Sequence, residues 1–329
     1  MSALRRRGLA AALMAAPAFC RPAGAQPSPA PEFPSRPLRL VAGFPPGSAA
    51  DLAARLVAPG LSAALGQTVV VENRPGAGSN IAAEGVARAT PDGHSILFGS
   101  VANTINASLQ RDLPFDFARD FAPVAPLVTV PNLLVVHPSV EARSLAALVA
   151  LAKEKPGGLF FGSSGIGTAP HLSGEMLNLM AGIRMTHVPY PGSAQAVTDL
   201  IAGRVSVMFS PASTVLGAVR EGRLVALAST GGARTGAAPD LPTMEEAGLP
   251  GFESAVWFGL YVPAATPRPV IARLAAAAQA AMAAPATRAA LAAQGFDLLE
   301  GGPEALARLT AAETGKWARV VDASGARGN

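Results

Sequence analysis

The sequence predicts an α/β fold in which two domains, each a mostly parallel sheet flanked by helices, are joined by two crossover strands. Short apolar runs alternate with stretches of helical pattern, which is what a parallel sheet with covering helices requires. Several runs end in a Gly- or Ser-rich junction, as after Leu38–Val41, Val69–Val71 and Leu159–Phe161. The chain has 329 residues, 50% of them hydrophobic, which is enough for two ordinary cores.

The first junction shows the pattern most fully. The run Leu38–Val41 predicts a buried strand, and Pro45 and Pro46 end it because neither offers a backbone donor. Ser48 is a good helix N-cap with Asp51 three residues later, so a helix should begin there. Its free N–H groups and positive dipole end can hold a carboxylate or phosphate without Arg or Lys. Taken alone, the stretch also fits an ordinary junction whose donors are met by water and Ser48.

Elements of the same alternating kind are expected along the rest of the chain. The helical stretch 49–65 should kink or split at Pro59–Gly60, because proline interrupts the hydrogen bonds of a helix. A short capped helix is expected over 243–247. The helix from Pro170 should face the core through Leu172, Met176 and Leu179. Strands are expected at 69–71, 96–98, 124–130, 133–136, 159–161, 205–209, 224–228 and 252–262. Other helices are expected at 81–89, 145–153, 194–201, 269–284, 286–293 and 303–322.

Pro131 and Asn132 separate two apolar segments, and the chain is expected to cross into a second domain there. The extended segment 252–262 suits a return strand to the first domain. Domain 1 is therefore expected to comprise residues 36–131 and 257–329, and domain 2 residues 132–256. Two domains joined by two crossovers indicate a cleft that closes by hinge motion.

Residues 1–25 are predicted to be a removable export signal. Arg5–Arg7 form a positive n-region, an apolar stretch too short to span a bilayer follows, and Ala23–Ala25 is a small-residue cleavage site. The paired arginines leave both the general secretory and the twin-arginine routes open. The mature protein should begin at Gln26 in the periplasm, and residues 26–35 should form a mobile tether.

Removal of this signal takes away four of the 26 basic residues and none of the 22 acidic ones, which leaves 22 of each. No basic face is then implied, so nucleic-acid binding loses its electrostatic support. Cys20 is the only cysteine and lies in the signal, so the mature protein should have no disulfide and no thiolate metal site. The histidines show no metal-binding spacing, and no metal or cofactor is expected.

Two patterns in the sequence could indicate an enzyme: a hydrolase triad and a dinucleotide-binding loop. Ser164, His171 and Asp199 could form a hydrolase triad, but the sequence around Ser164 is not a G-x-S-x-G elbow. The stretch Gly76–Gly78 resembles part of a dinucleotide-binding loop, yet Ile81 occupies the third glycine position. Neither pattern supplies a complete catalytic or cofactor site, so the protein is expected to bind and not to catalyse.

Five longer motifs follow one another along the chain: FPPGSAAD at 44–51, VVVENRPGAGSNIAAE at 69–84, SSGIGTAPHLSGE at 163–175, HVPYPGSAQAVTDL at 187–200 and WFGLYVPAATP at 257–267. Their order and spacing cover nearly the whole mature chain, from about Phe33 to Ala326. In these motifs the chain resembles the substrate-binding proteins of tripartite tricarboxylate transporters, often called the Bug family. The resemblance implies a two-domain periplasmic-binding-protein clamshell of type II that holds carboxylates through loop backbone groups, polar side chains and ordered water.

Carried over by position, the resemblance implies ligand contacts from both domains. Those of the first domain are Phe44, Gly47, Ser48, Ala49 and Asp51, with Asn80 and Asn103 nearby. Those of the second are Ser163, Ser164, Thr168, His171, Tyr190, Ser193 and Ala194, with Ser210 at a strand end. Three positions depart from the family pattern: Ser48 stands where a second glycine is common, Pro191 where lysine is usual, and Ser210 where aspartate is frequent. Asp51 also fits a purely structural role at the start of its own helix.

The neutral Ser210 predicts a ligand without a positive charge, because a buried ammonium without a carboxylate partner would be costly. A small mono- or dicarboxylate or an aromatic acid fits, and a tricarboxylate is less favoured. Tyr190, Phe44 and Trp257 could form an apolar wall, or could equally pack in the hinge and core. The implied partner is the membrane permease of a tripartite transporter, with the protein itself a monomer. A solute sensor that signals to a receptor is the alternative that remains open.

Overall fold

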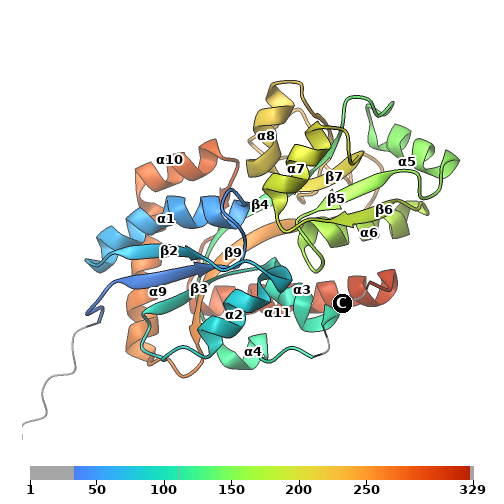
Figure 1. The fold of residues 1–329 in the computed structure, drawn as a ribbon. Helices are drawn as coiled ribbons and strands as arrows, with labels where there is room; N and C mark the ends of the chain where they lie inside the picture. Colours follow the sequence, from blue (N-terminus) through green and yellow to red (C-terminus); the bar gives the residue numbers. More distant parts are fainter. Residues whose placement is uncertain (1–32, 111, 327–329) are drawn as a thin grey trace, which may run out of the picture. The chain divides into compact units, whose positions relative to one another are not determined.

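The computed structural model describes residues 33–110 and 112–326 (Figure 1). The predicted export signal and residues 26–32 of the predicted tether lie outside these residues. The strands are β1 Leu38–Ala42, β2 Val69–Asn73, β3 Ser95–Ser100, β4 Phe121–Val136, β5 Phe160–Ser163, β6 Thr186–Pro189, β7 Val207–Pro211, β8 Val225–Ser229, β9 Ala255–Pro263 and β10 Asp297–Leu298. The helices are α1 Ala49–Leu65, the 3₁₀ turn η1 Ala77–Ser79, α2 Asn80–Ala87, α3 Val101–Leu109, α4 Phe117–Asp120, α5 Leu145–Glu154, α6 Ala169–Ala181, α7 Ser193–Ile201, α8 Ala212–Arg220, α9 Arg268–Ala283, α10 Pro285–Ala293 and α11 Pro303–Ser324.

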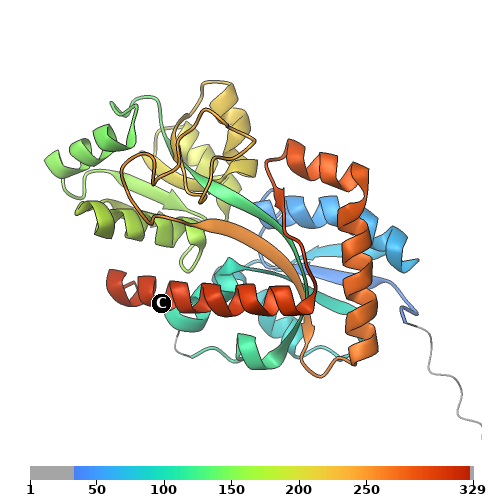
Figure 2. The same cartoon turned by 180° about the vertical axis from the view of Figure 1, so that it is seen from behind.

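Two sets of parallel strands are joined by a pair of long antiparallel strands, in the order β2-β1-β3-β9-β4-β7-β5-β6. The strands β1, β2 and β3 are mutually parallel, and so are β5, β6 and β7. Helices cover both sets (Figures 1 and 2). The predicted fold class, mostly parallel sheets flanked by helices with two crossover strands, is therefore confirmed.

The crossover strands β4 and β9 run side by side through the middle of the described fold (Figure 2). β4 pairs with β9 from Phe121 to Pro131 and then with β7 and β8 from Asn132 onward. The two apolar segments expected on either side of Pro131 are thus one strand of 16 residues. Proline is tolerated there because the pairing partner changes at that residue, so its missing N–H interrupts neither ladder.

Helix α1 runs without a break through Pro59, so of the kink or split expected at Pro59–Gly60 the split is wrong. Pro59 and Arg55, whose carbonyl loses its helical partner, are both exposed, so water can satisfy that carbonyl. Gly60 faces α9, where an added Cβ would lie 2.9 Å from the Cβ of Ala281. This glycine therefore permits close packing of the two helices and does not mark a break.

Two further expectations about the second half of the chain were wrong. Residues 243–247 form a turn, although Thr243 and Glu246 exchange the two hydrogen bonds of a capping box. Gly248 with a φ of 110° and Pro250 then prevent the turn from continuing as a helix. In α6, Leu179 is exposed, and Leu177 is the residue that packs in the core.

The core divides into two clusters of buried side chains. The larger one joins β1, β3, β4 and β9 to helices α1, α3 and α9, and the smaller one joins β5 and β7 to α5 and α6. Helix α11 packs on α3 and β4 and also reaches α6 (Figure 2). Among the described residues, no single helix has the length and apolar content of a membrane span; only α9 and α10 taken together meet those criteria, with a 69° bend between them.

Candidate functional site

Five helices begin around one narrow cavity of about 30 Å³. The N-cap or first residue of α1, α3, α6, α7 and α8 lines it, so the positive dipole ends of five helices lie around a small space with mostly apolar walls. A cavity of this size holds about two waters, or the two oxygens of one carboxylate. Its lining residues are Phe44, Ser48, Ala49, Ala50, Ser100, Val101, Ala102, Ser164, Thr168, Ala169, Pro170, Ser193, Pro211, Val256 and Phe258.

The first wall of this cavity is held by contacts among residues close in sequence, between Gly47 and Arg55. The Ser48 hydroxyl accepts a hydrogen bond from the Asp51 N–H at 3.2 Å, which caps α1. The Asp51 carboxylate accepts one from the Gly47 N–H at 3.0 Å and one from Arg55 Nε at 2.8 Å. Asp51 is 5% exposed and does not line the cavity. Its carboxylate fixes the loop that presents Phe44, Ser48 and Ala49.

A third strand-to-helix junction supplies the cavity wall at α3. Ser100 and Asn103 form a capping box in which the Ser100 N–H donates to Asn103 Oδ1 at 3.0 Å. Asn103 Nδ2 and both side-chain polar atoms of Asn80 are buried without a partner among the described residues. Neither asparagine lines the cavity, so both lie behind its wall.

The opposite wall is a loop held by residues distant in sequence. Ser163 Oγ accepts a hydrogen bond from the Gly165 N–H at 3.1 Å and lies 2.7 Å from His187 Nε2. His171 Nδ1 accepts from the Gly167 N–H at 3.4 Å. The two imidazole rings stack with their centroids 4.2 Å apart. Burial lowers the pKa of His171 to about 4 and that of His187 to about 3, so both rings are neutral near pH 7.

A wider cavity of about 600 Å³ lies beside the narrow one, and Phe44 and Ser164 line both. It extends between the turn that precedes α2 and the loops before α6 and α7. Its lining residues are Gly43, Phe44, Pro75, Gly76, Ala77, Gly78, Ser79, Gln110, Ser164, Gly165, Ile166, Pro189, Tyr190 and Pro191. Among the described residues that line either cavity there is no Asp, Glu, Lys, Arg or His.

The two rims of this cleft approach each other at glycines. A Cβ added to Gly192 would lie 3.0 Å from Pro45 Cγ, and one added to Gly47 would lie 3.8 Å from Ala194 Cβ. A Cβ added to Gly167 would collide with the Asn106 side chain. Small residues at these positions therefore allow the two sides to come together.

The carried-over residues fall into two groups in the structure. Those that line a cavity are Phe44, Ser48, Ala49, Ser164, Thr168, Tyr190 and Ser193. Those that do not are Gly47, Asp51, Asn80, Asn103, Ser163, His171, Ala194 and Ser210. Ser210 is fully buried, with Oγ 2.7 Å from Thr214 Oγ1, and its neighbour Pro211 lines the cavity in its place. Trp257 also lies away from both cavities and is buried in the larger core cluster.

Several lining residues were not singled out from the sequence. Pro211 ends β7, and Val256 and Phe258 belong to β9; long-range strand pairing brings all three to the cavity. Ser100 could have been found, because its junction has the same strand-to-helix pattern as the first one. Gln110 and Ile166 carried no local signal.

The hydrolase interpretation is not supported by the geometry. Asp199 accepts hydrogen bonds from the Tyr190 hydroxyl at 2.9 Å and from Arg204 at 2.6 Å, and His171 is bound to the backbone of its own loop. Within residues 33–110 and 112–326, no group of three or more His, Cys, Asp or Glu is arranged to hold a metal ion. The arrangement offers backbone donors and hydroxyls, which bind anions without chemistry.

Comparison with known proteins identifies the family. Residues 53–326 match the model described as the tripartite tricarboxylate transporter family receptor. Protein BugT of Bordetella pertussis is 35% identical over 305 residues, which cover 92% of this chain and 94% of BugT.

Comparison with solved structures points to the same family. An R. palustris protein with adipate is 35% identical with a TM-score of 0.86, over 89% of this chain and 99% of that one. MatC from Rhodopseudomonas palustris with bound malate is 32% identical with a TM-score of 0.84, over 88% and 100%. The chain belongs to the Bug-type receptor family of tripartite tricarboxylate transporters, which is a family of solute-binding receptors and not of enzymes.

Proposed function

We propose that this protein captures a small organic carboxylate in the cleft described above and delivers it to a membrane permease. The observation that carries the proposal is the meeting of five helix N-termini around one small cavity without charged lining residues. The adipate and malate of the two solved relatives are carboxylates of this kind. Helix N-termini favour such an anion through their N–H groups and dipoles.

The affinity can be bounded from the donors. Each hydrogen bond to a charged oxygen contributes about 1.5–3 kcal/mol net, so three or four of them supply roughly 5–12 kcal/mol. Desolvation of the carboxylate and closure of the cleft oppose this gain. A net value of about −8 kcal/mol corresponds to a micromolar Kd, which suits capture followed by release.

Among the carried-over residues, we assign direct ligand contact to those that line the cavities: Phe44, Ser48, Ala49, Ser164, Thr168, Tyr190 and Ser193. We assign support of the loops to Gly47, Asp51, Asn80, Asn103, Ser163, His171 and Ala194. Ser210 also stands behind the wall. The inference that the ligand lacks a positive charge then rests on the described lining itself, which offers no carboxylate to an ammonium group.

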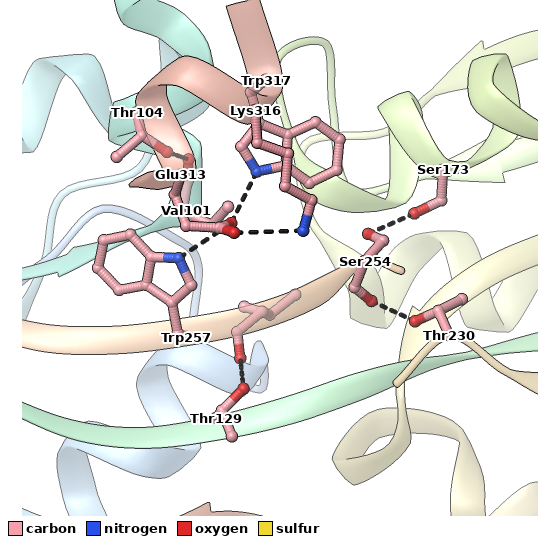
Figure 3. Close-up of polar contacts among 11 residues, drawn as sticks. Val101, Thr104, Thr129, Ser173, Thr230, Ser254, Trp257, Glu313, Lys316 and Trp317 are labelled. Carbon is pink, nitrogen blue, oxygen red and sulfur yellow. Dashed lines mark hydrogen bonds and ion pairs between the residues drawn. The ribbon is translucent and has the colours of Figure 1, made fainter. Parts of the chain in front are cut away.

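We place the hinge where β4 and β9 cross between domain 1, residues 36–131 and 257–329, and domain 2, residues 132–256. Thr230 ties the two crossovers together there (Figure 3). Its hydroxyl accepts from the Asn132 N–H at 3.0 Å and donates to the Ser254 carbonyl, while the Ser254 hydroxyl accepts from Ser173 at 2.7 Å. These contacts hold the strands in register while the domains move.

The protein is proposed to act in the periplasm as a monomer. The predicted signal at residues 1–25 and cleavage before Gln26 support export, and membership of a transport-receptor family supports a permease as partner. Mass analysis of the mature N-terminus tests the export step. Retention of Met1 in protein recovered from the periplasm would contradict it.

Native mass spectrometry of the purified protein, followed by a thermal-shift panel of organic acids and amino acids, tests the binding function. We expect a carboxylate to be retained in the cleft, to stabilise the fold and to be recovered unchanged. Stabilisation by unmodified aspartate or glutamate alone would contradict the inference about charge, and turnover of esters or amides would contradict binding without catalysis.

A further inference from the structure

We propose that Glu313 of α11 is a positioning residue for the ligand site, although it lines neither cavity. Its carboxylate fixes the indole of Trp257, and through Trp257 it sets the positions of Val256 and Phe258. These two neighbours of Trp257 on β9 line the narrow cavity. The inference rests on the proposed function, because it concerns the cavity to which that function assigns the carboxylate.

The Glu313 carboxylate joins the two tryptophans of the chain (Figure 3). Its Oε2 atom accepts hydrogen bonds from Trp257 Nε1 at 3.3 Å and from Trp317 Nε1 at 2.9 Å. Its Oε1 atom lies 3.2 Å from Lys316 Nζ, which supplies the opposite charge. Trp257 is 3% exposed and Trp317 is fully buried. An indole N–H is only a donor, so removal of Glu313 would leave two buried donors without their acceptor.

The two faces of β9 meet different neighbours, because side chains alternate between the faces of a strand. Trp257 and Tyr261 hydrogen-bond to side chains of α11, and a Cβ added to Gly259 would lie 2.7 Å from a leucine of the same helix. Val256 and Phe258 lie between these positions in sequence and line the narrow cavity. The residue held by Glu313 is therefore directly bonded to both cavity-lining residues of β9.

The narrow cavity is sensitive to the position of this wall because it is small. Its volume of about 30 Å³ leaves room for about two waters, so a slight displacement of Val256 or Phe258 changes what it accepts. On the side of β4, the Thr129 hydroxyl donates to the Val256 carbonyl at 3.3 Å. Glu313 restrains the same part of β9 from the side of α11. A binding site keeps its geometry when such supporting hydrogen bonds fix the residues that line it.

A second hydrogen bond joins β9 to α11 at a point away from the cavities. The Tyr261 hydroxyl lies 2.6 Å from Thr310 Oγ1, which itself donates to the Leu306 carbonyl. The neighbours of Tyr261 on the strand, Leu260 and Val262, line neither cavity. Tyr261→Phe therefore breaks a buried contact between the same two elements without acting on the ligand site, and it is the matched control for Glu313.

Calorimetry with hexanoate and adipate, together with urea unfolding, tests this proposal on the mature protein. Glu313→Ala and Tyr261→Phe should both lower the urea midpoint. Only Glu313→Ala should lose affinity, by about tenfold for each acid that the wild-type protein binds. Glu313→Gln should restore the affinity to within about twofold of wild type, because one amide oxygen can still accept from both indoles. Equal affinity losses in Glu313→Ala and Tyr261→Phe would overturn the inference.

Trp257→Phe shows whether Glu313 acts through Trp257, because it keeps a ring in the core and removes the N–H. Alone it should lose affinity about tenfold, and it carries the same prediction if Glu313→Ala does not fold. Glu313→Ala should cause no further loss in the Trp257→Phe background. A further tenfold loss there would contradict the assigned route. Wild-type affinity in Glu313→Ala would overturn the inference and leave carboxylate binding intact, whereas failure of the wild-type protein to bind either acid would overturn both.

Discussion

The two loops that face each other across the cleft are stabilised in different ways. The loop before α1 is held by residues within one stretch of eight, through Ser48, Asp51 and Arg55. The loop before α6 is held partly by His187, which is 24 residues from the Ser163 hydroxyl it contacts. A local network can be inferred from sequence spacing, whereas a network between strands depends on the fold. We therefore expect substitutions in the loop before α1 and in the loop before α6 to change stability and ligand affinity by different amounts.

The largest loss of ligand affinity is expected from a substitution in the loop before α6, where that loop contacts α3. Gly167→Ala puts a methyl group against Asn106 and occupies a φ of 77°, which disfavours a side chain. We expect an affinity loss of about 100-fold, or roughly 2.7 kcal/mol, in calorimetry with hexanoate.

Gly182→Ala is the matched control for that substitution. Its φ of 61° carries similar backbone strain, but an added Cβ meets nothing within 4 Å. This variant should lose about 1 kcal/mol of stability and keep its affinity. Equal affinity losses in the two variants would show that backbone strain, and not obstruction of the cleft, is responsible.

The histidine pair should make stability depend on pH. Because the folded-state pKa values of His171 and His187, about 4 and about 3, lie below the unfolded value, the unfolded chain binds more protons as pH falls below about 6.5. Stability is therefore nearly complete above that pH and declines through the window down to about pH 3, where the lower of the two folded-state pKa values lies. Urea unfolding at pH 6.5 and pH 5 should differ by about 3 kcal/mol.

The double variant His171→Gln, His187→Gln identifies the source of this slope. It should be less stable at pH 7 but should lose little further stability between pH 6.5 and pH 5, where few carboxyl groups titrate. An unchanged slope in the double variant would assign the pH dependence to other groups.

Ser163→Ala should cost about 1–2 kcal/mol of unfolding free energy, because it leaves His187 and the Gly165 N–H without their buried partner. The chain offers a matched pair at its surface, where the exposed Ser139 lies 2.6 Å from His137. Ser139→Ala should cost less than about 0.5 kcal/mol. Comparable costs at the two serines would mean that burial of the Ser163 contact contributes little.

The smallest loss of stability and affinity is expected from a substitution in the hydrogen-bond network of the loop before α1. Asp51→Asn keeps the shape of the side chain but weakens its bonds to the Gly47 N–H and Arg55, at a cost of about 1 kcal/mol. Asp116→Asn, at the exposed cap of the four-residue α4, is the control and should cost less. Affinity for hexanoate should fall only a few-fold in Asp51→Asn, since Asp51 lines neither cavity.

Much of the fold could be predicted from the sequence because its signals are local. The strand β1, the cap at Ser48 and the crossover near Pro131 follow from apolar runs and from the backbone limits of proline and serine. The expected split at Pro59 was wrong, and water can satisfy the exposed Arg55 carbonyl that loses its helical partner there. The expected helix over 243–247 was wrong because a capping box closes only one turn when Gly248 and Pro250 follow.

The candidate site was less predictable than the fold. Residues at helix starts, such as Ser48 and Thr168, could be named because the position of a cap is visible in sequence. His171, also expected at the ligand, lines neither cavity and accepts a hydrogen bond from the Gly167 N–H of its own loop. Val256 and Phe258 reach the cavity through the pairing of β9 with β3 and β4, which no local pattern encodes.

The central claim is that helix N-termini around a cavity with uncharged walls hold a carboxylate. Calorimetric comparison of hexanoate with hexanamide tests it most directly, because the two differ in charge and hardly in shape. Hexanoate should bind with a Kd of about micromolar order, and hexanamide should bind at least 100-fold more weakly, since it carries no negative charge for the N–H groups and dipoles to stabilise. Equal affinities for the acid and the amide would contradict the account.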